Sequence, residues 1–163
     1  MSEQTTQSGR SGSRDTVRGR DLEVRHAVVV RASREDAWRA LATGPGLDGW
    51  FTSGAEVDAR PGGRIVFRWR DWGVDGYTGE DAGPVLEAEA PARLVFQWHP
   101  GGPKYATTVT LALEETGRGT VIRVVERGFP DTAPGLRTLI GNATGWGEAL
   151  ALLKCRLEHG GRA

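Results

Sequence analysis

The chain has 163 residues, and its 21 lysine and arginine side chains balance its 21 aspartate and glutamate side chains. This length suits one domain with a substantial core, and the balanced charge gives no bulk attraction to nucleic acid or to an anionic membrane. The single cysteine, Cys155, excludes an intramolecular disulfide, and no run reaches the roughly 18 apolar residues of a membrane span, so we expect a cytoplasmic protein without nucleic-acid or membrane partners.

The N-terminal segment differs in composition from the rest of the chain. Residues 1–22 are mainly Ser, Thr, Gln, Gly and Arg, with almost nothing apolar. Such a segment cannot bury enough surface to offset the entropy cost of ordering, which predicts a disordered tail ahead of one domain over residues 23–160. The domain opens with a strand over 24–31, marked by consecutive valines.

Two short helices follow this strand. Ser33 is a favourable N-cap for a helix that ends at Gly44 and Pro45, and a second helical turn then carries Trp50 and Phe51. From residue 55 the apolar residues alternate, as in half-buried strands. We expect strands over 55–58, 64–70, from 77 with an interruption near Gly83 and Pro84, 92–98, 105–114 and 120–127.

The last element is a long helix. Its apolar residues recur at steps of three or four and form one stripe: Leu136, Leu139, Ile140, Ala143, Trp146, Leu150, Leu153 and Leu157. Pro134 suits the first turn, whereas each of Gly141, Gly145 and Gly147 costs about 1 kcal/mol relative to alanine inside a helix. We expect close backbone contact or bending at these glycines, with Ile140, Ala143 and Trp146 bordering a cavity.

Short glycine-rich turns between successive strands predict an antiparallel meander. A sheet of six to seven strands curls, and a long helix laid on its concave face buries the apolar side. The fold class is therefore α+β, with a curved sheet around the C-terminal helix and a cavity between them.

Six segments stand in an order that is typical of one family: VRASREDAWRAL, GWF, RPGGRIVFRW, GPVLEAEAPARLVFQW, GRGTVIRVVERGF and GWGEALALLKCRLE. Over roughly residues 24–159 the chain resembles the AHSA1-like proteins, homologues of the Hsp90 ATPase activator, in the START/Bet v 1-like (SRPBCC) superfamily. The resemblance implies a helix-grip fold around a cavity. It implies no catalytic set, since the superfamily is diverse in function.

The residues themselves offer little catalytic or metal chemistry. The three histidines, His26, His99 and His159, are far apart and lack metal-ligand spacing. No G-x-S-x-G elbow is present, and the glycine-rich segments join strands rather than open helices. We therefore expect no metal, no cofactor and no recognisable catalytic residues.

The candidate site is the cavity. Its expected ligand-binding residues lie on the inward faces of strands and helix, on the connection after the short helices and beside the hairpin loop: Trp50, Phe51, Phe67, Trp69, Tyr77, Phe96, Trp98, Glu126, Phe129, Asn142 and Trp146. Plain core packing is the alternative for each aromatic residue.

Glu126 needs separate comment because alternation places it on the same side as Ile122 and Val124. It could orient a ligand with Asn142, Tyr77 or His99, or else lie at a strand end and reach solvent or an arginine. The ligand role predicts that Glu126→Gln changes ligand affinity more than it changes stability.

Three hypotheses of function follow. The first is a module that binds a small, mostly apolar, aromatic or lipid-like molecule in the cavity. The second is an enzyme of the same fold, such as a cyclase, hydratase or hydrolase that uses acid–base chemistry. The third is a chaperone-associated stress protein. A chaperone and a second copy of the chain are accordingly the protein partners we consider.

Overall fold

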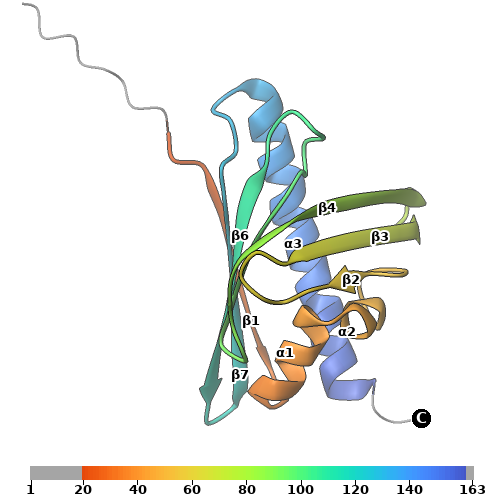
Figure 1. The fold of residues 1–163 in the computed structure, drawn as a ribbon, viewed down its shortest axis with the longest axis vertical. Coiled ribbons are helices and arrows are strands. Elements are labelled where there is room, and N and C mark those ends of the chain that lie inside the picture. Colours follow the sequence, from red (N-terminus) through yellow and green to blue (C-terminus); the bar gives the residue numbers. More distant parts are fainter. Residues whose placement is uncertain (1–19, 161–163) are drawn as a thin grey trace, which may run out of the picture.

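The computed structural model describes residues 20–160. The elements follow the expected order along the chain (Figure 1). Their bounds are β1 (Glu23–Val30), α1 (Arg34–Ala42), α2 (Gly44–Asp48), β2 (Glu56–Val57), β3 (Arg64–Trp72), β4 (Tyr77–Glu89), β5 (Arg93–Trp98), β6 (Thr107–Thr116), β7 (Gly119–Arg127) and α3 (Ala133–His159). Residues 1–19 of the expected tail lie outside the described part of the chain.

Within residues 20–160 the strands form one seven-stranded antiparallel sheet in the order β1-β7-β6-β5-β4-β3-β2. Figure 1 shows the β1, β6 and β7 part nearly edge-on, while β3 and β4 leave it and cross in front of α3. The sheet is therefore strongly curved, and α3 lies along its concave side. This confirms the helix-grip fold predicted from the sequence.

The sharpest departure from the expected elements is in β4. The predicted interruption near Gly83 and Pro84 is wrong, because β4 runs continuously and changes partner there. Residues 77–84 pair with β3, and residues 85–89 pair with β5. Gly83 permits the crossing, since a Cβ at this position would lie 1.8 Å from the carbonyl oxygen of Gln97. The switch carries the start of β4 and the end of β5 to the same corner of the molecule.

The helices begin as the capping residues predict. Ser33 Oγ accepts a hydrogen bond from the backbone N–H of Asp36 at 3.1 Å. Thr132 Oγ1 accepts one from the N–H of Gly135 at 3.1 Å, with Pro134 in the first turn. Helix α3 is thus longer than the predicted apolar stripe at both ends.

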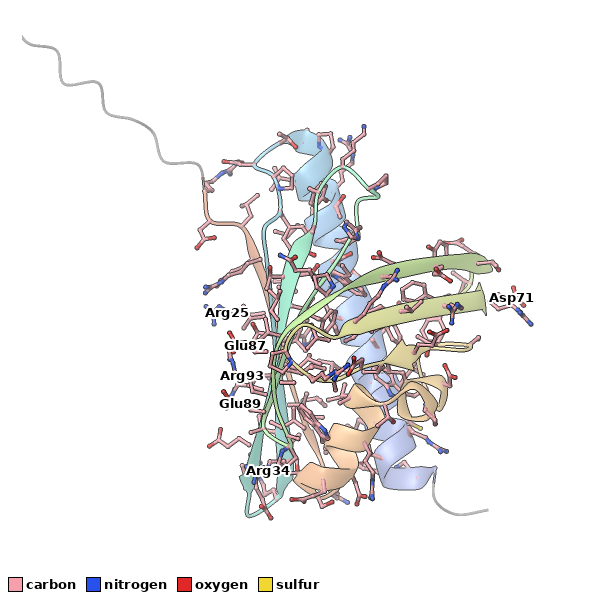
Figure 2. The ribbon with its side chains drawn as sticks, viewed as in Figure 1. Arg25, Arg34, Asp71, Glu87, Glu89 and Arg93 are labelled. Carbon is pink, nitrogen blue, oxygen red and sulfur yellow. The ribbon has the colours of Figure 1, made fainter. Side chains whose placement is uncertain are left out.

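Charged and apolar side chains lie on opposite faces of the sheet, as the alternation predicts. Figure 2 shows Arg25, Glu87, Glu89 and Arg93 on the side of the sheet away from α3. The opposite side and α3 supply the core, in which Val109, Ile122 and Leu153 are completely inaccessible to solvent. Burial of this apolar face between sheet and helix is the main favourable term in folding.

Two expectations for α3 need correction. Ile140 is 63% exposed and does not border a cavity, because the buried arc of this part of the helix runs through Leu139, Ala143 and Trp146. Gly141 and Gly145 make no close backbone approach: a Cβ on either would have no neighbour within 4 Å. These two glycines keep one flank of the helix open.

Candidate functional site

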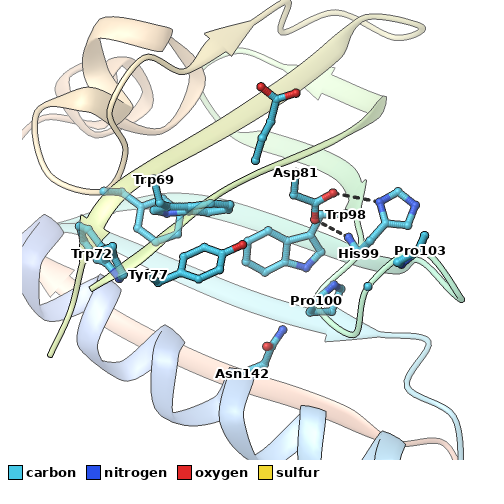
Figure 3. Close-up of a pocket in the computed structure, with 12 residues that line it drawn as sticks. Trp69, Trp72, Tyr77, Asp81, Trp98, His99, Pro100, Pro103 and Asn142 are labelled. Carbon is cyan, nitrogen blue, oxygen red and sulfur yellow. Dashed lines mark hydrogen bonds and ion pairs between the residues drawn. The ribbon is translucent and has the colours of Figure 1, made fainter. Parts of the chain in front are cut away.

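A groove open to solvent lies where the start of β4, the end of β5 and α3 meet (Figure 3). Its volume is about 570 Å³, within the range of small-molecule sites. Its lining combines aromatic, acidic and small residues: Phe51, Trp69, Trp72, Tyr77, Glu80, Asp81, Trp98, His99, Pro100, Gly102, Pro103 and Asn142. A smaller hollow of about 110 Å³ shares Phe51, Trp72, Trp98 and Asn142 and adds Gly141, Gly145 and Trp146.

One wall of the groove is a chain of aromatic rings. The ring centroids of Trp69 and Tyr77 are 5.8 Å apart, and Phe51 meets Trp69 edge-on at 5.6 Å and Trp72 at 5.5 Å. Tyr77 is half exposed, so its ring has a free surface for a ligand. These rings come from β3, β4 and the loop after α2. Only the curved sheet brings them together.

The loop that carries Phe51 is held by Asp48. Its carboxylate accepts hydrogen bonds from the Thr52 hydroxyl at 2.7 Å and from the N–H groups of Gly54 and Ala55, each at 2.8 Å. Partial burial would raise the pKa of Asp48, but these hydrogen bonds outweigh it and leave the pKa below its ordinary value. Asp48 therefore fixes the turn from which Phe51 reaches the groove.

Behind the groove lies the completely buried carboxylate of Glu126. Its Oε1 accepts from Trp98 Nε1 at 2.7 Å and from the Thr107 hydroxyl at 2.5 Å, and its Oε2 accepts from Trp146 Nε1 at 2.8 Å. Asn142 Nδ2 donates to both oxygens at 3.0 Å. A carboxylate can only accept, so four neutral donors suit it without an arginine or solvent.

This network fixes the orientation of the Asn142 amide. The NH₂ group must face Glu126, because two acceptors would oppose each other if the amide were turned over. Asn142 also lines the groove, as Figure 3 shows beneath Trp98. The carbonyl oxygen, Oδ1, is therefore the atom that Asn142 can offer to a ligand.

A second polar pair lies at the other end of the groove. Asp81 accepts from His99 Nδ1 at 3.0 Å with one oxygen and from the His99 backbone N–H at 2.6 Å with the other (Figure 3). The carboxylate therefore selects the tautomer with hydrogen on Nδ1, and Nε2 of the neutral ring becomes an acceptor. Asp81 links β4 to the residue that follows β5.

The structure separates the predicted site residues into three groups. Phe51, Trp69, Tyr77, Trp98 and Asn142 line the groove. Trp146 borders the smaller hollow, and Glu126 lies behind the lining. The remaining four, Trp50, Phe67, Phe96 and Phe129, are buried in the core.

The interior between sheet and helix is nearly filled. The space bordered by Trp50, Phe67 and Phe96 has a volume of about 20 Å³, little more than one water molecule needs. The internal cavity expected from the sequence is therefore replaced by an open groove nearer the surface. The groove, at about 570 Å³, is far larger than this interior space.

Several residues of the site did not emerge from the sequence. Thr107 could have been found, since it continues the inward alternation of Val109 and Leu111 and lies opposite Trp98 in the β5–β6 register. Asp81 could not, because its contact with His99 depends on the crossing at Gly83. No periodicity or motif encodes that crossing.

Two further properties of residues 20–160 bear on function. No group of three or more His, Cys, Asp or Glu side chains in this part of the chain could hold a metal ion. None of its helices combines the length and apolar character needed to cross a membrane. Cys155 is exposed.

Comparison with known proteins gives one family and many similar folds. The family described as activator of Hsp90 ATPase homolog 1-like protein matches residues 31–158. The Aha1 dimer from Colwellia psychrerythraea is 23% identical, with a TM-score of 0.70 over 85% of this chain and 98% of that chain. The AHSA1-like protein from Aeromonas hydrophila is 21% identical, with a TM-score of 0.67 over 85% of this chain and 96% of its own.

A third similar structure is DynU16, a putative protein in the dynemicin biosynthetic locus. It is 21% identical, with a TM-score of 0.73 over 86% of this chain and 49% of that one. No curated protein matches the sequence. At these identities the solved structures establish the fold alone.

Proposed function

The chain belongs to the family of activator of Hsp90 ATPase homolog 1-like proteins, and from this we propose that its groove binds a small, mostly apolar, aromatic molecule. The observation that carries the proposal is the groove of about 570 Å³ with one wall of aromatic rings. Flat rings gain from stacking or edge contact with such a wall, by about 0.5–1.5 kcal/mol per pair beyond apolar burial. The family and its fold support ligand binding in general, and the lining supports this ligand class.

The role we propose for Glu126 is to position the lining. It holds the indole groups of Trp98 and Trp146 and the amide of Asn142 from behind. Direct contact between Glu126 and a ligand, which the sequence suggested, would require Asn142 or an indole to move aside. In the present arrangement the ligand meets Trp98 and Asn142, and Glu126 keeps them in place.

A neutral probe, 1-naphthaleneethanol, tests the proposal. In a titration followed by ¹H–¹⁵N NMR, we expect the indole N–H signals of Trp69, Trp72 and Trp98 to shift, because these rings line the groove. The signal of Trp38, which lies in α1 outside the groove, should stay in place. Tyr77→Ala should weaken binding about tenfold, because it removes one exposed ring of the wall.

Val74→Ala is the matched control, since Val74 lies in the same hairpin and is fully exposed. Its affinity for 1-naphthaleneethanol should equal that of the wild type. Unshifted groove indoles at millimolar probe, or equal loss of affinity in both variants, would contradict the proposed function.

A second candidate function, acid–base catalysis in the groove, is favoured by the Asp81–His99 pair. A carboxylate that orients an imidazole through Nδ1 is a common arrangement for a general base. If His99 acts in this way, we expect saturable hydrolysis of 1-naphthyl acetate that is lost in His99→Gln and kept in His26→Gln. His26 is exposed on β1 outside the groove. Hydrolysis that does not saturate, or that both variants retain, would eliminate this candidate.

A further inference from the structure

We infer that the groove selects aromatic ligands that donate hydrogen bonds, and that it prefers a cationic amine to a carboxylate of the same shape. This inference rests on the proposed function, since it specifies the polar group of the ligand that the aromatic wall holds. It follows from the hydrogen-bonding state and the charge of the lining residues.

The first observation concerns hydrogen-bonding capacity. Asn142 commits its NH₂ group to Glu126 and retains Oδ1. His99 commits Nδ1 to Asp81 and retains Nε2, an acceptor in the neutral ring. Trp98 also lines the groove, but its Nε1–H is committed to Glu126. In these three residues the donors are thus committed inside the protein, while the acceptors Asn142 Oδ1 and His99 Nε2 remain for a ligand.

The second observation concerns charge. Within the described residues the lining contains two carboxylates, Glu80 and Asp81, and neither lysine nor arginine. Glu80 pairs with Arg68 at 2.7 Å, which offsets its charge. Asp81 has no arginine or lysine within ion-pair distance in the described residues, and its partners are His99 and backbone N–H groups. A carboxylate in the groove would face like charge, whereas an ammonium group would be attracted.

The third observation is that the aromatic rings of the groove can attract the ammonium group of a ligand. An ammonium group that approaches Asp81 enters the groove that Trp69, Tyr77 and Trp98 also line, and Figure 3 shows Trp98 next to Asp81. Aromatic faces attract cations within about 6 Å of the ring centroid. The same ligand can therefore place its ring on the wall and its ammonium group toward Asp81 and His99 Nε2.

Three probes with one ring system test the selectivity: 2-(1-naphthyl)ethylamine, 1-naphthaleneethanol and 1-naphthaleneacetate. Calorimetric titration of the wild-type protein at pH 7.5 should rank affinity as amine, then alcohol, then carboxylate. We expect the amine to bind at least about tenfold more tightly than the carboxylate, a ratio that partly screened charges at a few ångströms can produce. Salt should reduce this ratio, because part of it is coulombic.

Asp81→Asn should reduce the amine-to-carboxylate ratio severalfold. Glu89→Gln removes the same charge from the same strand on the face away from α3, and it should leave the ratio unchanged (Figure 2). Equal binding of all three probes, or preference for the carboxylate, would overturn the inference and leave the proposed function standing. If none of the probes binds the wild-type protein, the proposed function itself fails, and the inference fails with it.

The wild-type ranking decides the question even if Asp81→Asn disturbs the turn that follows β5. A ratio that falls in both Asp81→Asn and Glu89→Gln would also count against the inference, because it would assign the preference to overall charge rather than to the groove.

Discussion

Glu126→Ala should destabilise the folded protein by about 4 kcal/mol, near the upper end for a single substitution. The methyl group cannot accept hydrogen bonds, so four donors lose their partner: the buried Thr107 Oγ1 and Trp146 Nε1, and the partly buried Trp98 Nε1 and Asn142 Nδ2. Each unsatisfied buried donor costs about 1–3 kcal/mol, and relaxation of the helix recovers part of the sum. Urea unfolding followed by circular dichroism measures the difference.

Glu126→Gln should also destabilise the folded protein, by about half as much as Glu126→Ala. The glutamine oxygen can still accept, but its NH₂ group must face at least one indole or amide donor. Glu115→Gln is the matched control, because Glu115 is exposed on β6, and its unfolding midpoint should equal that of the wild type. A Glu126→Gln protein as stable as this control would mean that the network does not hold the fold together.

Alternation alone predicts that Glu126→Gln changes ligand affinity more than it changes stability. The structure predicts a large loss of stability as well, because the carboxylate is completely buried and joins β7 to β5, β6 and α3. Loss of the carboxylate should also weaken binding of 1-naphthaleneethanol, since Trp98 and Asn142 lose the partner that positions them. Stability and affinity are therefore expected to fall together.

The sequence predicts those parts of the fold that depend on local patterns. Ser33 marks the first helix because a hydroxyl can accept from an exposed helical N–H, and Pro134 marks the last because it needs no partner there. Alternation along residues 120–127 places Glu126 inward, as the structure bears out. These features follow from neighbours a few residues apart.

The features that the sequence did not predict depend on which distant segments meet. Pro84 suggested a break because proline lacks a ladder donor, yet β4 only changes its partner strand there. The position of Ile140 on the apolar stripe predicted burial, but the stripe does not show which arc of the helix the sheet covers. Large aromatic residues such as Phe67 and Phe96 each suit a core, and only as a group do they indicate a site; the structure places these two in the core.

Gly83→Ala should be the most damaging of the glycine-to-alanine changes in β3 and β4. We expect it to lower the free energy of unfolding by about 3 kcal/mol or more. The new Cβ would lie 1.8 Å from the carbonyl oxygen of Gln97 and 2.7 Å from its carbonyl carbon. These are backbone atoms, so no side chain can rotate away to make room. The strands must separate, and β4 then loses the contact at which it passes from β3 to β5.

Gly117→Ala is the matched control, since a Cβ there would have no neighbour within 4 Å. Its stability should equal or slightly exceed that of the wild type, because alanine restricts the unfolded chain more than glycine does. The two variants should also differ in the groove. Separation at Gly83 moves Asp81 relative to His99, so binding of 1-naphthaleneethanol should weaken in Gly83→Ala and stay unchanged in Gly117→Ala. If Gly83→Ala unfolds and binds like the control, the close crossing does not set the shape of the groove, and Asp81 and His99 must be brought together by the turn after β5 instead.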